Sequence, residues 1–218
     1  MRGQPVQDLY TQKAKLYQSF FERFLKWETV LGAFFREHRL LRPGMKLLDA
    51  GCGAGAVTKT LYRLARQEGI EGITFDGFDL TPAMLDLFGE WIQQAGTREI
   101  RLQQADALEL DGRLPSDWTG YDLIISAAML EFIPKDRLGL VLERLKRRLK
   151  DSGRLLLLVT RRTWIARLSG AKWWGTNLFD RSEPETVLDQ AGFTRIQFLR
   201  LPGYWDVFLL AILASAGS

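Results

Sequence analysis

Residues 47–56 read LLDAGCGAGA. A short apolar run, typical of a buried strand, leads there into glycines at every second position, and residues 57–67 continue with a helical pattern. Glycines allow a tight turn and a close approach of the backbone to a ligand, and the start of a helix presents free N–H groups. The loop also fits an ordinary Gly-rich turn or, through Gly51, Gly53 and Ala56, a dinucleotide fingerprint, so by itself it is ambiguous.

Outward from this loop, strand patterns alternate with helix patterns. Thr81-Pro82 opens the helix after the second strand, with Thr81 as N-cap and Pro82 at the first helical position. The alternation predicts an α/β fold with a parallel sheet covered on both faces, which binds ligands beyond the carboxyl ends of its strands. We expect strands at 45–50, 73–80, 100–104, 121–127 and 154–160, helices at 57–67, 135–150 and 183–191, and a final antiparallel hairpin of 193–201 and 204–213 around Pro202-Gly203.

Composition narrows the class of protein. The 218 residues carry a net charge of +4 and contain one cysteine, Cys52, and one histidine, His38, so neither a disulfide framework nor a Cys/His metal site is expected. The N-terminus lacks the apolar segment of a signal peptide, and the strongly apolar stretch 207–214 is too short to span a bilayer. We therefore expect a soluble, cytoplasmic protein.

Acidic residues follow three successive strands. Asp49, beside the glycines, would repel a pyrophosphate and attract a ligand with an ammonium and a sulfonium, such as S-adenosylmethionine. Asp79 lies 24 residues after Gly55, where a strand-end carboxylate can accept both hydroxyls of a ribose, or can simply favour a helix start. Asp106 could accept from the exocyclic amine of an adenine.

These residues resemble the motifs of class I S-adenosylmethionine-dependent methyltransferases. Residues 47–55 look like the first motif, Asp79 matches the acid of the second, Asp106-Ala107 match the third, and 121–134 (YDLIISAAMLEFIP) are similar to the fourth. The resemblance covers residues 40–218 and implies a Rossmann-like sheet of seven strands, mostly parallel with an antiparallel last strand and helices on both faces. It also implies a methyltransferase domain at 41–218.

The resemblance assigns roles to matching positions. It implies that the cofactor S-adenosylmethionine is held by Asp49, Gly51 and Gly53 at its methionyl part, by Asp79 at the ribose, by Leu80, Asp106 and Ala107 at the adenine, and by Ser126 near the ammonium and the methyl group.

Helical periodicity runs from residue 6 to residue 40, and we interpret 1–40 as an N-terminal helical cap. Tyr10 and Tyr17 lie on it and could touch the cofactor, although aromatics at helical spacing are more often core. His38 fits a helix-surface residue better than a catalytic one.

Methyl transfer depends mainly on alignment and exclusion of water, but an oxygen or carbon acid also needs a base near the methyl group. Glu131, in the loop after the fourth strand, is the candidate catalytic residue. Its alternative interpretation is a solvent-facing or N-capping carboxylate.

Residues 161–179 combine Trp164, Trp173 and Trp174 with four basic residues and no acid, and 135–172 hold twelve Lys/Arg against three Asp/Glu. Such a segment suits a membrane interface, an acidic apolar ligand or single-stranded nucleic acid, or it packs as a lid on the core. We interpret 161–180 as a lid or substrate insertion and favour a small, apolar or lipid-like acceptor, as in the enzymes that methylate quinone precursors and lipid head groups.

Peripheral contact with a membrane through 161–179 is a further expectation, and a nucleic-acid partner is disfavoured. Three other functions stay open. These are an RNA or protein methyltransferase that docks through 135–172, a non-catalytic S-adenosylmethionine-binding module, and a nicotinamide-dependent reductase, against which Asp49 and the final hairpin argue.

Overall fold

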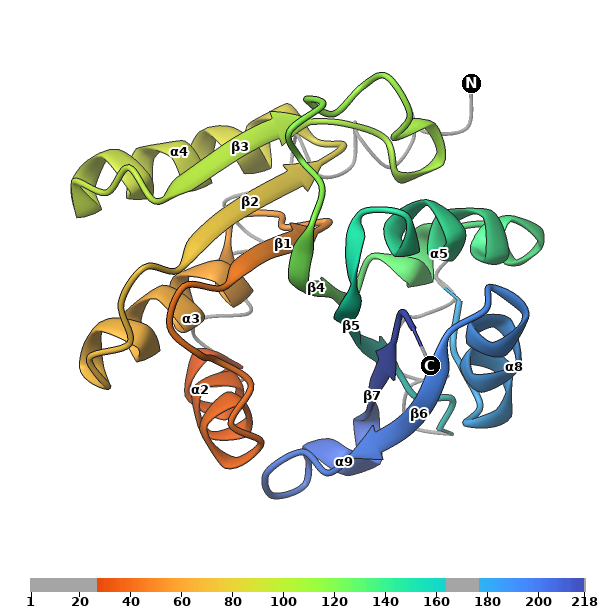
Figure 1. The fold of residues 1–218 in the computed structure, drawn as a ribbon. Coiled ribbons are helices and arrows are strands. Elements are labelled where there is room, and N and C mark those ends of the chain that lie inside the picture. The colour runs from red at the N-terminus through yellow and green to blue at the C-terminus, as the bar shows by residue number, and fades with distance from the viewer. Residues whose placement is uncertain (1–26, 164–176, 218) are drawn as a thin grey trace. The chain divides into compact units, whose positions relative to one another are not determined.

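The computed structural model describes residues 27–163 and 177–217, and the chain divides into two compact units, 1–115 and 116–218 (Figure 1). Its seven strands make the mixed sheet of a Rossmann-like fold, with six strands parallel and β7 antiparallel, as the sequence predicts. The two units are described in turn because each positions a different part of the candidate site.

The first unit has a parallel sheet in the order β3-β2-β1. The register pairs Ala50 with Phe78 and Asp79 with Gln104, so the carboxyl ends of these strands lie together. Helix α4 lies against β2 and β3, while α2 packs against α3. The elements are α2 (Trp27–Glu37), β1 (Lys46–Ala50), α3 (Ala56–Gln67), β2 (Thr74–Asp79), α4 (Pro82–Ala95), β3 (Ile100–Gln104) and the 3-10 turn η1 (Ala107–Glu109).

Local sequence explains the bounds of α4. Thr81 has an extended backbone at the N-cap and Pro82 takes the first helical position, where its missing N–H costs no helical hydrogen bond. Gly96 ends the helix in the left-handed conformation, with φ of 62°. The predicted start of this helix is therefore confirmed, although the Thr81 side chain makes no capping hydrogen bond.

The second unit has the strand order β4-β5-β7-β6. Strand β5 pairs in parallel with β4 and antiparallel with β7, and β7 pairs antiparallel with β6. Helix α8 packs against α5 and β6. The elements are β4 (Tyr121–Ala127), the 3-10 turns η2 (Leu130–Phe132) and η3 (Lys135–Arg137), α5 (Leu138–Lys146), β5 (Leu149–Thr160), α8 (Ser182–Gln190), β6 (Thr194–Leu199), α9 (Trp205–Phe208) and β7 (Leu209–Ser215).

Two predicted boundaries in this unit are wrong. The expected helix 135–150 is a 3-10 turn followed by the shorter α5, because Leu149 already pairs with Tyr121 and begins β5. Gly153 permits the bulge that follows, since a Cβ there would lie 2.7 Å from the Tyr121 carbonyl oxygen.

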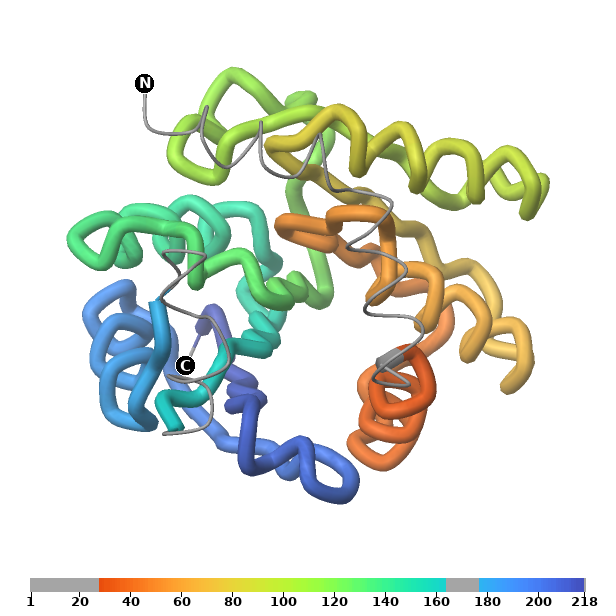
Figure 2. Tube along the Cα trace, turned by 180° about the vertical axis from the view of Figure 1, so that it is seen from behind, coloured from red at the N-terminus to blue at the C-terminus, as the bar shows by residue number. Residues whose placement is uncertain are grey.

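The second strand of the hairpin begins at Leu209 rather than at 204. Residues 205–208 form α9, where the Asp206 carboxylate accepts a hydrogen bond from the Leu201 N–H and closes the turn. This connection between β6 and β7 projects from the end of the hairpin in both views (Figure 2).

Candidate active site

The glycine loop turns at the carboxyl end of β1. Gly51, Gly53 and Gly55 all have positive φ, at 75°, 51° and 86°, a region that side chains disfavour. The N–H groups of Gly51 and Cys52 both donate to the Phe78 carbonyl oxygen at 2.9 Å, which fastens the loop to the end of β2. These two hydrogen bonds and the three glycine conformations thus set the shape of the loop.

Asp79 ties this loop to the start of α4. One carboxylate oxygen accepts from the Gly53 N–H at 2.9 Å, and the other accepts from the Thr81 N–H at 2.8 Å. Burial raises the pKa of Asp79, while these hydrogen bonds lower it. A carboxylate has about four lone-pair sites, so each oxygen can still accept from a further donor. The part-buried group can thus receive ligand hydroxyls at an orientation already set by the backbone.

Asp49 lies behind the loop and is buried. Its Oδ2 accepts from the Thr58 hydroxyl at 2.7 Å and from the Thr58 N–H at 3.3 Å, so the first turn of α3 holds it in place. Burial raises the pKa of Asp49 to about 6, against the effect of the Thr58 hydrogen bonds. The group is therefore ionised at neutral pH and contributes negative charge beneath the loop.

Cys52 also belongs to the loop, and its thiol is protonated at neutral pH. Burial, followed by the charges of Asp49 and Asp79, raises the pKa of Cys52 well above its ordinary value. A nucleophilic role is therefore not supported, because the thiolate is the reactive form.

Asp106 and Ala107 follow β3 beside this site. The Asp106 carboxylate accepts from the Leu108 N–H at 2.8 Å and caps the 3-10 turn η1, and the Ala105 N–H donates to the Asp79 carbonyl oxygen. Leu80 is half-buried, and its carbonyl oxygen accepts from the Gln104 amide. The structure thus brings together all the predicted cofactor residues of the first unit at the ends of three adjacent strands.

Ser126 and Glu131 belong to the second unit, at and after the end of β4. Ser126 is buried, and its hydroxyl has no hydrogen-bond partner among the residues that the structure describes. Two residues later, Ala128 has a φ of +58°, rare for a side chain other than glycine, and its N–H donates to the Leu158 carbonyl oxygen. This bend turns the chain from β4 into the turn that carries Glu131.

Glu131 is only 3% exposed, so its interpretation as a solvent-facing carboxylate is wrong. Its side chain contacts Thr160 of β5 and does not cap the turn η2. Its Oε1 accepts from the Thr160 N–H at 2.7 Å and from the Thr160 hydroxyl at 2.9 Å. Its Oε2 has no partner in the described part of the chain. Burial raises the pKa of Glu131 to about 7, although the Thr160 hydrogen bonds oppose the rise. Such a group can take up or release a proton near neutral pH.

Thr160 and Asn177 are contacts of Glu131 that sequence reasoning missed. The Asn177 N–H donates to the Glu131 carbonyl oxygen at 2.8 Å, and its amide donates to the Ile133 carbonyl oxygen at 2.6 Å. The one signal available was Thr160 itself, because a threonine ends the otherwise apolar run of β5.

The remaining candidate residues are His38 and five aromatic residues. The His38 ring packs edge-on against Phe34 at 4.7 Å, just past the end of α2. Tyr10, Tyr17, Trp164, Trp173 and Trp174 lie outside the described residues. Within residues 27–163 and 177–217, no group of three or more His, Cys, Asp or Glu side chains could hold a metal ion, and no helix is long and apolar enough to cross a membrane.

Comparison with known proteins agrees with this arrangement. The family described as "Methyltransferase domain" matches residues 47–153, from β1 into β5. The carboxy-S-adenosyl-L-methionine synthase of Pseudomonas paraeruginosa is 37% identical over 134 residues, 59% of this chain and 47% of that protein. The mitochondrial ubiquinone biosynthesis O-methyltransferase of Schizosaccharomyces pombe is 28% identical over 136 residues, 62% of this chain and 44% of that protein.

Among solved structures, the magnesium protoporphyrin IX methyltransferase of Synechocystis, crystallised with S-adenosylhomocysteine, shares the fold with a TM-score of 0.72. It is 17% identical, and the match covers 99% of each chain. The chain spans about half the length of the two sequence relatives named above. The matched family and the strand order identify residues 47–153 as a methyltransferase domain of the class I S-adenosylmethionine-dependent kind.

Proposed function

We propose that this chain binds S-adenosylmethionine and transfers its methyl group to a small, apolar or lipid-like acceptor. The observation that carries the proposal is the Asp79 carboxylate, held by the Gly53 and Thr81 N–H groups with lone pairs left for ligand hydroxyls. The ionised Asp49 beneath the loop suits a ligand that carries an ammonium and a sulfonium.

The proposed cofactor fits the residues present. Gly51, Gly53 and Asp49 would hold the methionyl part, Asp79 the ribose hydroxyls, and Leu80 the adenine face. Asp106 keeps lone pairs beyond the one that accepts from Leu108, so it and the Ala107 N–H would meet the adenine edge. The unpartnered Ser126 hydroxyl would meet the ammonium and methyl end. When bound, S-adenosylmethionine supplies an electrophilic methyl group on a sulfonium.

Glu131 is our candidate for proton handling. Its Oε2 is buried and unpartnered, and its pKa of about 7 leaves it ionised above neutral pH. We propose that Oε2 accepts the proton of an acceptor hydroxyl as the oxygen takes the methyl group. A hydroxyl acceptor is in keeping with the relative from S. pombe, which is named as an O-methyltransferase.

Apolar character of the acceptor is supported by the composition of residues 161–179, with three tryptophans and four basic residues. The same segment is our proposed point of peripheral contact with a membrane. Flotation with vesicles of anionic phospholipid tests this contact, and we expect a Trp173→Ala/Trp174→Ala variant to float less.

A second candidate function follows from the 37% identity to a carboxy-S-adenosyl-L-methionine synthase. In such a reaction S-adenosylmethionine itself would be modified, and its methyl group would not pass to another molecule. The two functions share the cofactor site in the first unit and differ in what becomes of the methyl group.

One experiment separates these functions. S-adenosylmethionine with a labelled methyl group is incubated with the protein and a whole-cell extract, and the label is followed into organic, small aqueous and macromolecular fractions. We expect label in the organic fraction, absent with Asp79→Ala and retained with Asp86→Ala, an exposed carboxylate on α4. Label kept on a modified sulfonium in the aqueous fraction would establish the second candidate, and label in RNA or protein would contradict both.

A further inference from the structure

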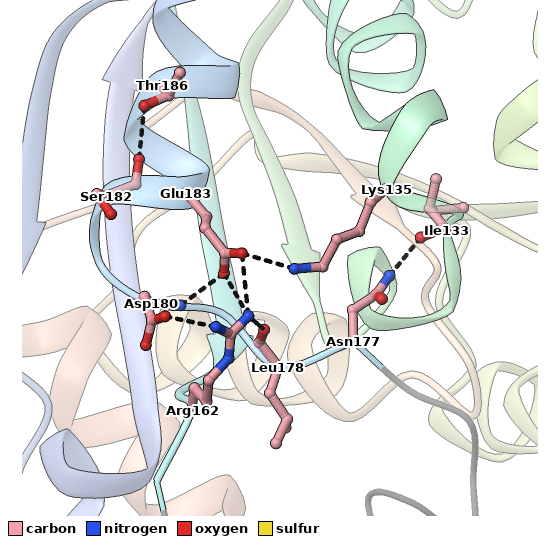
Figure 3. A network of polar contacts seen from close by, with 9 residues as sticks. All are labelled: Ile133, Lys135, Arg162, Asn177, Leu178, Asp180, Ser182, Glu183 and Thr186. Carbon is pink, nitrogen blue, oxygen red and sulfur yellow. Dashed lines mark hydrogen bonds and ion pairs between the residues drawn. The ribbon is translucent and has the colours of Figure 1, made fainter.

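Polar contacts join the turn after β4 to the two flanks of residues 164–176 (Figure 3). The flank before that segment contains Thr160 and Arg162, and the flank after it runs over 177–183. At one side of the arrangement Glu131 binds Thr160 through its side chain, while Asn177 binds the main chain of the turn at Glu131 and Ile133. The turn is therefore held at its Glu131 end.

The other end of the turn is held by Glu183, which lies in the first turn of α8. Its Oε1 accepts from the Lys135 ammonium at 2.7 Å, and both of its oxygens accept from one Arg162 guanidinium nitrogen at 3.0 Å. Arg162 also donates to the Asp180 carboxylate at 2.7 Å and to the Leu178 carbonyl oxygen at 3.0 Å. In Figure 3 the Glu183 carboxylate lies between Lys135 and Arg162.

These contacts close a ring. Lys135 is four residues after Glu131, and Arg162 is two residues after Thr160. The same two segments are thus joined twice, once by Glu131 with Thr160 and once by Lys135 and Arg162 through Glu183. Two links between the same two segments allow less relative motion than one link does. The link through Glu183 therefore restricts how far the turn can move at the Glu131–Thr160 link.

The exposure of the ring indicates what it does for the fold. The side chains of Lys135, Arg162 and Glu183 are 48%, 37% and 33% exposed. Ion pairs at such exposure add little to stability, because water screens them and ordering long side chains costs entropy. The Arg162 guanidinium nevertheless binds two carboxylates at once, Glu183 through one nitrogen and Asp180 through the other, which restricts its orientation. The ring is therefore better suited to setting a position than to holding the fold together.

We propose that Glu183 is a positioning residue for Glu131: by holding Lys135 and Arg162 together, it fixes the turn 131–135 against the end of β5 and keeps the free oxygen of Glu131 in its place. The role rests on the proposed function, in which Glu131 takes the acceptor proton. A simpler role for Glu183 is a helix-start carboxylate, since its Oε2 also accepts from the Asp180 N–H at 2.9 Å.

The test compares Glu183→Gln with Glu185→Gln, an exposed glutamate two residues further along α8. Glutamine keeps an oxygen for the Asp180 N–H but loses the charge that binds Lys135 and Arg162. We expect Glu183→Gln to lower kcat about tenfold, with the affinity for S-adenosylmethionine and the melting temperature unchanged. Lys135→Met should lower kcat similarly, and the double variant should be no worse than Glu183→Gln alone.

A measurement without turnover keeps the test independent of the proposed function. The Glu131 carboxyl carbon, labelled with ¹³C and assigned by its absence in Glu131→Gln, is titrated by NMR. We expect its midpoint to fall from about 7 towards 4.5 in Glu183→Gln, because a displaced carboxyl meets water. An unchanged midpoint would overturn the positioning role, as would a kcat loss that only follows a loss of folded protein. A shifted midpoint in a protein that transfers no methyl group would uphold the positioning role and refute the proposed function.

Discussion

For Glu131, the stability of the fold favours the protonated carboxyl, whereas the proposed chemistry requires the ionised carboxylate. An ionised carboxylate loses hydration when it is buried, and Thr160 supplies hydrogen bonds to only one of its oxygens. The folded chain therefore binds the Glu131 proton more tightly than the unfolded chain does, with a pKa of about 7 against an ordinary value of 4.5. Above neutral pH Glu131 is therefore a buried negative charge. The proposed role as proton acceptor requires this charge, whereas the stability of the fold does not.

Glu131→Gln separates the two demands. Because the folded pKa is raised, wild-type stability is complete below pH 4.5 and falls as the pH rises towards 7. Glutamine does not titrate, so the variant should gain stability relative to wild type through this window, by up to about 3 kcal/mol above pH 7. Methyl transfer should fall by roughly 10²- to 10⁴-fold.

Denaturant melts and initial rates between pH 4.5 and 8.5 measure both effects. The wild-type rate should rise to a plateau above pH 7, as the ionised carboxylate is the acceptor of the proton. Glu143→Gln removes an exposed carboxylate on α5 and should leave both curves as in wild type. A Glu131→Gln protein with a wild-type rate would remove Glu131 from the mechanism.

The positions of the candidate site residues could be predicted from the sequence, but most of their contacts could not. Asp49, Asp79 and Asp106 were predicted from their places at strand ends, and the structure puts them at the ends of three adjacent strands. Their internal partners were not foreseen, because Thr58 and Thr81 act through local hydrogen bonds that have no periodic signal. The burial of Glu131 was missed since it depends on Thr160, 29 residues away.

At the scale of the element, the glycine loop is shaped by α4 as well as by β1. A Cβ on Gly55 would lie 2.5 Å from the Phe88 ring, which belongs to α4, and the φ of Gly55 is +86°. Gly69 has a similar φ of +65°, yet a Cβ there would meet nothing within 4 Å. A side chain at either glycine would therefore be strained by the positive φ, but only a side chain at Gly55 would also collide with a neighbouring residue.

Gly55→Ala should destabilise the protein more than Gly69→Ala. Both variants incur about 1–2 kcal/mol for a side chain in the left-handed region. Only the first also forces Phe88 to move, which adds about 1–3 kcal/mol, as overpacking does. Urea unfolding of both variants measures the difference in their free energies of unfolding. Equal losses of stability would show that Phe88 moves aside without destabilising the protein.

Element boundaries were predictable where local residues set them. Strands β3 and β4 have the predicted bounds, and α4 begins at Pro82 as expected. The boundary between α5 and β5 was not predictable, because the charged run 146–151 suits a helix and only pairing with Tyr121 draws Leu149 into the sheet. Likewise α9 lies in a segment whose composition favours a strand, and its Asp206 carboxylate accepts a hydrogen bond from the Leu201 N–H before the turn.

At the scale of the whole molecule, the fold followed from the alternation of strand and helix patterns. Buried parallel strands that are separated by short helices can be connected in only a few topologies. The hairpin at the end adds the antiparallel β7. The extents of the cap at 1–40 and of the insertion at 161–180 stay predictions. The motif residues do not encode which acceptor the protein uses, because the same cofactor-binding motifs occur with many different substrates.

The stability of the whole molecule should respond to the proposed cofactor. A ligand that binds only the folded state stabilises it by about 2.7 kcal/mol at a concentration 100 times its Kd. For a chain of 218 residues this corresponds to a rise in melting temperature of roughly 5–10 °C. We expect that rise with S-adenosylmethionine and none with NAD, since the ionised Asp49 disfavours a pyrophosphate beside the loop.

Asp79→Ala should abolish most of the rise, because hydrogen bonds to a charged group account for roughly a 10- to 100-fold change in affinity. Asp86→Ala should keep the full rise, which separates loss of the ligand contact from loss of an acidic residue on the same part of the chain. A shift with NAD and none with S-adenosylmethionine would contradict the assignment of the loop. A full shift with Asp79→Ala would instead move the ribose contact to another residue while leaving the cofactor in place.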